Sequence, residues 1–439
     1  MASAAEQLAS NINFSTFGKA KDLQGRILFT LGALLIYRLG TFIPLPGINT
    51  SALNELFQQN QSGILGMFDM FAGGAVGRMA IFALNIMPYI SAAIIMQLLV
   101  AVSPVLGQLK KEGERGRKQI YQYTRYGTVF LAALQAWGIS IGLEGAGNIV
   151  IDPGLYFRMS AVITLVGGVV FLMWIGEQVT ARGIGNGISL IIFAGIVAEL
   201  PSALVNTLEL GRQGALSTWL ILGVLILAII VIVTIVYVER AQRKLVVQYP
   251  RRQQGNKVFE GDSSHLPLKV NTAGVIPPIF ASALLLLPTS VSSFAGIGSD
   301  SPEWLITINS LLGRGQPIYL AIYIGLIVFF AFFYTAIVFN PDETADNLKR
   351  NGGFVPGIRP GPPTADYLDF VLTRLTAIGA LYLSAVCILP EILISKYSIP
   401  FYFGGTSLLI VVTVAIDTVT QAQSHMLAHQ YSGLSLIHI

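Results

Sequence analysis

The stretch WLILGVLILAIIVIVTIVYV, residues 219–238, contains no charged side chain. About 20 apolar residues form a helix long enough to cross the roughly 30 Å of hydrocarbon in a lipid bilayer. A helix also satisfies its own backbone hydrogen bonds, which an isolated segment in lipid must do. This stretch therefore predicts a transmembrane helix, and it decides the class of fold.

Comparable apolar stretches recur along the chain. Hydrophobic residues make up 53% of the 439 residues and charged residues only 11%, whereas soluble proteins carry about 25% charged residues. This composition excludes a soluble enzyme, a nucleic-acid-binding domain and a disordered scaffold. It predicts an all-α polytopic membrane protein with ten transmembrane helices, over residues 24–43, 79–102, 123–143, 159–176, 188–208, 217–238, 273–294, 318–339, 375–395 and 403–422.

The basic residues predict the orientation of these helices. Of the 27 Lys and Arg residues, 21 lie in the N-terminal segment or in the loops after even-numbered spans. Lys and Arg are enriched in cytoplasmic loops of membrane proteins. Both termini are therefore expected in the cytoplasm, which independently requires an even number of spans.

Ten spans divide into two halves of five, and an odd number of crossings places the halves in opposite orientations. Prolines interrupt the second span of each half, Pro88 in one and Pro277 and Pro278 in the other. Paired breaks in inverted halves indicate a functional path at their interface. The alternative is that both are kinks used only for packing. The predicted units are a cytoplasmic segment 1–23, an N-terminal half 24–208, an external loop 209–216, a C-terminal half 217–422 and a tail 423–439.

Two cytoplasmic loops, about 240–272 and 340–373, are long enough to dock a large cytoplasmic partner. The second contains the Pro- and Gly-rich run Val355–Pro363, which predicts a shaped hairpin because proline fixes φ and glycine permits tight turns. The alternative is that both loops are merely basic and face lipid headgroups.

Residues Ile64–Val76 form an apolar segment too short to span a bilayer, interrupted by Asp69, Gly73 and Gly74. A short half-helix that enters and returns is tolerated only where protein or water surrounds it. The alternative is a helix that lies on the membrane surface.

Residues that carry catalysis are not apparent. The sequence lacks an ATP-binding Gly-x-x-x-x-Gly-Lys-Ser/Thr loop, a His-Glu-x-x-His zinc motif and a Gly-x-Ser-x-Gly nucleophile motif. The single cysteine, Cys387, excludes an internal disulfide. Arg78 and Asp417 are the main ionisable candidates at membrane depth. We therefore expect no enzyme, cofactor or metal, but a passive channel. A secondary transporter of a small solute and an intramembrane protease are the competing hypotheses.

The chain resembles the SecY/Sec61-alpha family, the channel subunits of the Sec protein translocon. The motifs that carry the resemblance run in order from about residue 14 to about residue 431. They are 42–48 (FIPLPGI), 81–91 (IFALNIMPYIS), 110–114 (KKEGE), 176–178 (GEQ), 182–189 (RGIGNGIS), 265–271 (HLPLKVN), 339–341 (FNP), 344–349 (TADNLK), 354–361 (FVPGIRPG) and 400–410 (PFYFGGTSLLI).

This resemblance implies two pseudo-symmetric halves around an hourglass pore in the bacterial inner (plasma) membrane. Unfolded secretory precursor proteins would pass through the centre, and signal peptides and transmembrane segments would leave sideways into membrane lipid, between helices 2 and 3 on one side and 7 and 8 on the other. The channel would be passive, driven by the SecA motor ATPase or by the ribosome, and would assemble with SecE and SecG.

The resemblance also assigns residues. A narrow pore ring falls on Ile86, Ile90, Ile188, Ile192, Ile279 and Ile410. A plug falls on Ile64–Val76, including Ile64, Met67, Phe68, Met70, Phe71, Gly73 and Gly74. SecA and ribosome docking falls on Arg251, Arg252 and Arg359, although Arg251 and Arg252 also suit positive-inside anchoring. Lateral-gate positions are Ser91, Gln97 and Leu287. The chain departs from the family at Asn85, where glycine is more usual, and in the apolar residues 433–439, where a basic tail is usual.

Overall fold

The structure is a computed structural model of a mainly helical chain. It describes residues 21–59, 69, 71–145, 149–214, 217–249, 252–254, 257–259, 263–295, 316–397 and 405–435.

Each of the ten predicted spans overlaps a helix among the described residues. These helices are α3 (Lys21–Gly40), α6 (Met87–Val102), α8 (Glu114–Gly145), α9 (Leu155–Arg182), α10 (Gly187–Arg212), α11 (Thr218–Arg240), α12 (Ile276–Ala295), α14 (Pro317–Val338), α16 (Pro362–Tyr397) and α17 (Gly405–Ser435). Seven helices of the described part are long and apolar enough to cross a membrane individually, and an eighth span arises if α6 and α7 (Pro104–Lys111), which meet at 97°, form one broken span. The chain is thus a multi-pass membrane protein.

The second span starts later than predicted. Residues 79–86 form turns, and α6 begins only at Met87, with Pro88 in its first turn. In the other half, α12 begins at Ile276, immediately before Pro277 and Pro278. Proline is favoured in the first turn of a helix because the amide it lacks would have no partner there. In the first half the predicted span is therefore interrupted just before Pro88, whereas in the second half the prolines stand in the first turn of α12. In neither half do these prolines kink the interior of a helix.

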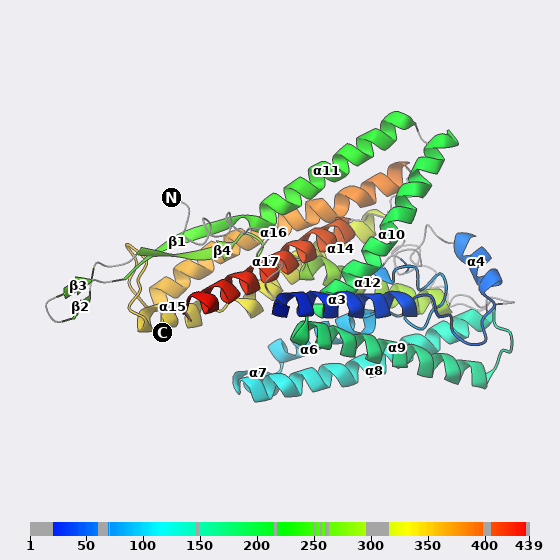
Figure 1. The fold of residues 1–439 in the computed structure, drawn as a ribbon, viewed down its shortest axis with the longest axis horizontal. Coiled ribbons are helices and arrows are strands. Elements are labelled where there is room, and N and C mark those ends of the chain that lie inside the picture. Colours follow the sequence, from blue (N-terminus) through cyan, green and yellow to red (C-terminus); the bar gives the residue numbers. More distant parts are fainter. Residues whose placement is uncertain are drawn as a thin grey trace.

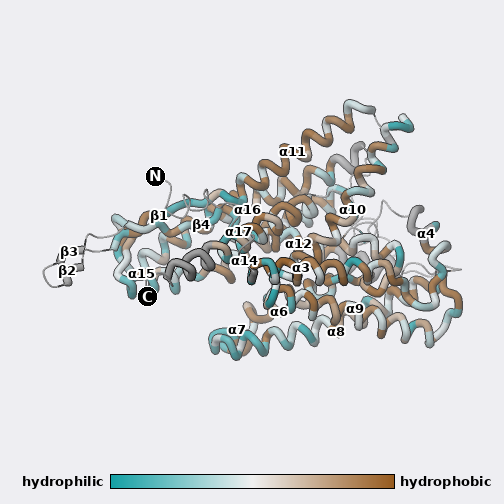
Figure 2. The backbone as a smooth tube through the Cα atoms, in the orientation of Figure 1, coloured by the Kyte–Doolittle hydropathy of each residue, from teal (hydrophilic) through white to brown (hydrophobic). Residues whose placement is uncertain are grey.

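The helices run side by side along the long axis of the molecule (Figure 1). The strands, α7 and α15 (Pro341–Arg350) gather toward one end of this axis, and α4 (Thr50–Gln59) lies toward the other. Hydrophobic residues fill the middle stretch of the helices, whereas hydrophilic residues concentrate on β1, β4 and α7 (Figure 2). This distribution suits a bilayer around the middle of the bundle.

The two long loops, about 240–272 and 340–373, differ from the prediction. The first, not the second, contains a hairpin, in which β1 (Gln242–Gln248) pairs with β4 (Ser263–Lys269) in antiparallel register. A smaller pair, β2 (Arg252–Gln254) and β3 (Lys257–Phe259), lies within the same loop. The second loop instead begins with α15, because the Asn340 side chain accepts hydrogen bonds from the amides of Asp342 and Glu343 and caps the helix.

The largest hydrophobic core joins both halves. Its buried residues come from α3, α6, α9 and α10 of the first half and from α11, α12, α14, α16 and α17 of the second. A second core, around Leu165 and Phe157, lies within the first half alone. The junction of the halves is therefore the apolar centre of the molecule.

Candidate functional site

The six predicted ring residues lie in one hydrophobic cluster, although they come from four separate parts of the chain. Ile86, Ile90, Ile192 and Ile410 are buried members of this cluster, and Ile188 and Ile279 are partly buried residues that pack against it. We call these six residues the apolar collar. They are supplied by α6 and the residue before it, by α10, by α12 and by α17. Isoleucine has no hydrogen-bonding group, so a narrow passage lined by these side chains disfavours water and ions.

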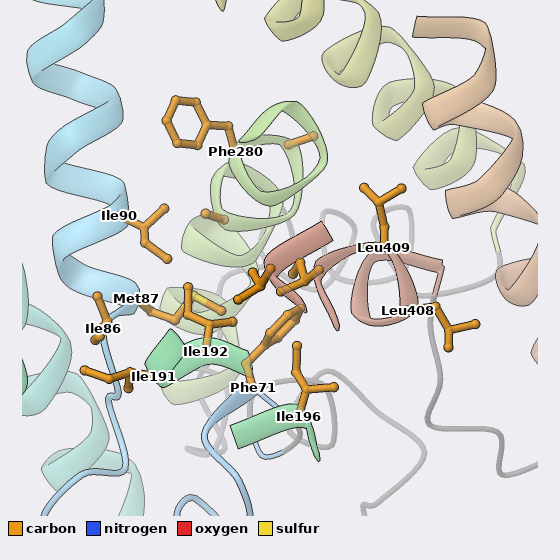
Figure 3. Close-up of a cluster of buried hydrophobic side chains, with 14 of the residues drawn as sticks. Phe71, Ile86, Met87, Ile90, Ile191, Ile192, Ile196, Phe280, Leu408 and Leu409 are labelled. Carbon is orange, nitrogen blue, oxygen red and sulfur yellow. The ribbon is translucent and has the colours of Figure 1, made fainter. Parts of the chain in front are cut away.

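Neighbouring residues complete this cluster (Figure 3). Met87, Ile191 and Ile196 lie beside the collar on the first half, and Phe280, Leu408 and Leu409 contribute from the second. Sequence reasoning missed all of them. Most of these residues are adjacent to a collar residue or a few positions from it, so they lie on the same helix. Proximity in sequence alone does not distinguish them from residues that face lipid.

The described part of the predicted plug segment lies against the collar. The Phe71 side chain is buried beside Ile192 and Ile196 (Figure 3). Gly73 and Gly74 have φ of +64° and +79°, in the left-handed region that favours glycine. A Cβ at Gly195 in α10 would lie only 2.5 Å from the Phe71 carbonyl oxygen, so this close approach also requires glycine. Ile64, Met67, Phe68 and Met70 lie outside the described residues.

Polar side chains from two elements hold this segment by its backbone carbonyls. In α3, the Tyr37 hydroxyl donates to the carbonyl of Ala72 at 3.2 Å and Arg38 Nη1 donates to that of Gly73 at 2.6 Å. Asn85 Nδ2 donates to the carbonyl of Phe71. Asn85 itself has φ of +47°, and asparagine tolerates this region better than most residues other than glycine.

A second polar group surrounds the same segment. Asp69 Oδ1 accepts from the amide of Gly77 at 2.7 Å, and Arg78 lies 3.8 Å from Glu199 of α10. Burial raises the pKa of the Asp69 carboxyl to about 6, while the Gly77 amide and the Arg78 charge act in the opposite direction. The Arg78 guanidinium also lies 4.2 Å from the centre of the Phe42 ring.

Tyr37, Arg38 and Glu199 are not among the residues predicted from the sequence. Each is a polar residue within an apolar helix, which is the signal that the sequence offers for them. Arg78 and Asp417 are the main ionisable candidates that the sequence predicts at membrane depth. In the structure, Glu199 lies near Arg78. Glu239 and Glu391 are buried, whereas Asp417 is exposed.

The predicted lateral-gate residues lie on α6 and α12, and α12 packs against both α6 and α8. Ser91 is buried and Gln97 is half-buried. The Gln97 Oε1 atom is buried and has no hydrogen-bond partner among the described residues. Leu287 belongs to α12, but its side chain lies outside the described part. We call the contact of α12 with α6 and α8 the gate seam.

The predicted docking residues belong to the two long loops. Arg251 falls outside the described residues, Arg252 begins β2, and Arg359 is exposed in the turn that precedes α16. The two loops touch, because Gln248 and Phe354 exchange backbone hydrogen bonds of 2.9 and 3.0 Å. A small hydrophobic core that contains Leu245, Leu268 and Leu368 joins the β1–β4 hairpin to α16.

No group of three or more His, Cys, Asp or Glu side chains suited to a metal ion occurs among the described residues. Cys387 is a buried free thiol. What the arrangement offers is an apolar cluster where the halves meet, a segment packed against it and held by hydrogen bonds to its carbonyls, and a β hairpin that contacts the second long loop.

Known proteins are similar to this chain in sequence and in fold. The SecY family model matches residues 80–419. The protein translocase subunit SecY of Escherichia coli K12 is 54% identical over 422 residues, which cover 95% of each chain. A solved structure of a protein-conducting channel superposes with a TM-score of 0.60 at 17% identity, over 91% of this chain and 92% of that one. The canine Sec61 chain in a ribosome–channel complex gives a TM-score of 0.57 at 17% identity, with the same coverages.

Proposed function

The chain belongs to the SecY family, and from this premise we propose that it is the central subunit of a protein-conducting channel in the bacterial inner membrane. Unfolded secretory polypeptides pass between its two inverted halves, and signal sequences and transmembrane segments leave sideways into lipid. The channel forms and breaks no covalent bonds. The observation that carries this function is the convergence of six isoleucines from four separate parts of the chain at the junction of the halves.

The collar is the proposed seal for ions. Apolar side chains that meet at a constriction exclude water, yet can be displaced by a passing chain because no directional bond holds them. The segment from Asp69 to Val76 is the described part of the proposed plug. Hydrogen bonds from Tyr37, Arg38 and Asn85 to its carbonyls support a seated position that a substrate chain displaces.

The proposed partners are SecE, SecG, SecA and the ribosome, and both termini are proposed to lie in the cytoplasm. Ribosome binding draws support from canine Sec61 and from yeast Ssh1, whose structures are described as ribosome complexes. Basic side chains on the docking loops suit the phosphates of ribosomal RNA.

Reconstitution tests the function directly. Proteoliposomes that contain this chain with SecE and SecG, supplied with SecA, ATP and a secretory precursor, are expected to convert the precursor to a protease-protected form. Omission of ATP should abolish the protection. An absence of protection, when vesicles with the E. coli subunit protect the same precursor, would refute the proposal.

The collar has a test of its own. Replacing Ile86, Ile90, Ile192 and Ile410 together by glycine removes the apolar side chains that exclude water, so the resting ion conductance of planar bilayers should rise at least tenfold. The same number of substitutions at lipid-exposed positions of α11, Leu222, Ile226, Ile229 and Val233, provides the control. Conductance equal to wild type would remove these residues from the seal.

Docking is tested at Arg359. Because this side chain is exposed in a turn, Arg359→Glu should impair SecA-driven export several-fold while changing the melting temperature by no more than about 1 °C, as is usual for surface substitutions. Arg350→Glu, an exposed charge reversal at the end of α15, is the matched control. Normal export by the Arg359 variant would exclude it from docking.

A further inference from the structure

The β1–β4 hairpin, which we call the docking hairpin, is connected directly to two helices of the channel. The chain leaves α11 at Arg240, forms the hairpin between Gln242 and Lys269, and enters α12 at Ile276. At the root, the amide of Val270 donates to the carbonyl of Ala241 at 3.1 Å. Since α12 carries Ile279 and packs across the gate seam, a displacement of the root is also a displacement of the gate helix.

Two polar residues fasten this root. Glu239 lies in the last turn of α11 and is 9% exposed, and Asn271 follows β4 and is 4% exposed. Asn271 Nδ2 donates to Glu239 Oε1 at 2.7 Å and to the carbonyl of Gly274 at 3.0 Å. One amide group thus ties the end of α11 to the turn that begins α12.

The opposite side of the root is also enclosed. Gly379 of α16 approaches so closely that a Cβ there would lie 3.1 Å from the Val270 carbonyl oxygen and 3.6 Å from Asn271 Cα. The root therefore lies between α11 and α16 with little free space. A rigid, enclosed contact transmits displacement, whereas a loose connection would absorb it.

The acceptor in this contact is a carboxyl oxygen in a largely buried position. Loss of either partner leaves a buried polar atom unpaired. Two hydrophobic residues of similar size would pack at this position without that cost. The polar pair therefore fixes one particular geometry between hairpin and helix.

We propose that Glu239 and Asn271 are positioning residues that couple the docking hairpin to α12. A partner that binds and moves the hairpin then moves the start of α12, and with it the collar residue Ile279 and the gate seam. This inference rests on the proposed channel function. Without the pair, the partner still binds, but the hairpin bends without displacing the helix.

The experiment separates docking from coupling. Glu239→Leu and Asn271→Leu each remove one partner, Asn271→Asp is an isosteric second variant that removes the donor, and Glu239→Gln keeps an acceptor oxygen. Glu177→Leu is the matched control, because Glu177 pairs with Arg125 (Nε to Oε1, 3.0 Å) in the other half, away from the hairpin. Each full chain, assembled with SecE and SecG in proteoliposomes, is assayed for SecA affinity, for translocation of a secretory precursor, and for the change in deuterium exchange of residues 276–285 when SecA, ATP and precursor are added.

If the pair couples the hairpin to α12, the Leu and Asp variants should bind SecA with an affinity within twofold of wild type. Their translocation should fall at least tenfold, and SecA, ATP and precursor should not change the deuterium exchange of residues 276–285. Glu239→Gln and Glu177→Leu should stay within threefold of wild type. The double variant with leucine at both positions should be no worse than either single one.

Two outcomes overturn the coupling role. One is a parallel loss of SecA affinity and translocation, which indicates that the pair only maintains the folded hairpin. The other is wild-type translocation and exchange in the Leu and Asp variants. Wild-type vesicles that translocate nothing would instead refute the channel function itself.

Discussion

The two sides of the junction between the halves are built from different interactions. At the gate seam, most of the buried residues that α6 and α12 contribute are apolar, among them Ile90, Ile94, Phe280 and Ala283, and the buried polar ones are Ser91 and Ser282. On the other side, α17 packs against α10 and α3, and a hydrogen bond connects the halves there. The amide of Gly185, in the loop between α9 and α10, donates to Gln421 Oε1 of α17 at 2.8 Å.

The second contact, which we call the hinge seam, is reinforced from within the first half. The amide of Ile184 donates to the Thr30 hydroxyl of α3 at 3.1 Å. Leu23 and Ile184 pack there against Ala422 and Met426 of α17. The loop between α9 and α10 is therefore fixed to helices of both halves.

This difference indicates which side opens. Lipid tails are as apolar as leucine or isoleucine, so an apolar contact can part in a bilayer at little cost. Parting the hinge seam would also break a hydrogen bond, whose net value is about 0.5–1.5 kcal/mol. These contacts support the lateral exit proposed at the gate seam, with the hinge seam holding the halves together on the other side.

The largest effect is expected from Gly185→Val, which tests whether the hinge seam is tightly packed. Gly185 has φ of +86°, and a Cβ there would lie 2.9 Å from Leu190 Cδ1 and 3.1 Å from Thr418 Oγ1. Left-handed φ costs about 1–2 kcal/mol for a residue other than glycine, and overpacking adds about 1–3 kcal/mol. The variant should therefore lose about 2–5 kcal/mol of stability, measured as a fall in melting temperature in detergent.

Gly214→Val separates the two contributions to that loss. Gly214 also has positive φ, of +76°, but a Cβ there would meet nothing within 4 Å. It should therefore show only the smaller cost of backbone strain. Equal losses in the two variants would contradict a tightly packed hinge seam.

A smaller effect is expected at the gate seam from Gln97→Leu. The buried and unpaired Gln97 Oε1 atom weakens the closed state, since such a group costs about 1–3 kcal/mol. The leucine variant should close more firmly, and the fraction of a weakly apolar transmembrane segment released into lipid should fall about fivefold or more. Gln122→Leu, at an exposed position of α8, is the control. Unchanged release from the Gln97 variant would show that closure does not depend on this amide.

The sequence predicts the transmembrane spans but not the contacts between distant parts of the chain. Apolar runs such as 219–238 predict the spans because each transmembrane segment needs enough apolar residues of its own to cross the hydrocarbon core. The hairpin was assigned to the wrong loop, although Leu245 and Val247 of β1 are buried in alternation, because the prolines and glycines of 355–363 gave the more conspicuous signal.

Long-range contacts leave little trace in local sequence. Tyr37 and Arg38 hold carbonyls 35 residues away, and Gly185 binds a side chain 236 residues away. The six collar isoleucines are locally indistinguishable from isoleucines that face lipid. They were predicted only by resemblance to a family, and their convergence depends on how the two halves pack.

The smallest effect is expected from Gln421→Met, which keeps the length of the side chain and removes the acceptor at the hinge seam. Gln421 is exposed, so water can partly replace it at the Gly185 amide, and the loss should be near the net value of one hydrogen bond, about 0.5–1.5 kcal/mol. The melting temperature should fall by a few degrees at most, with resting ion conductance unchanged, because the collar does not depend on this bond. Gln423→Met, exposed two positions further along α17, should have no effect. If the Gln421 variant instead raised the conductance as much as loss of the collar isoleucines, the hinge seam would be part of the seal, and the two sides of the junction would not differ in the way their contacts indicate.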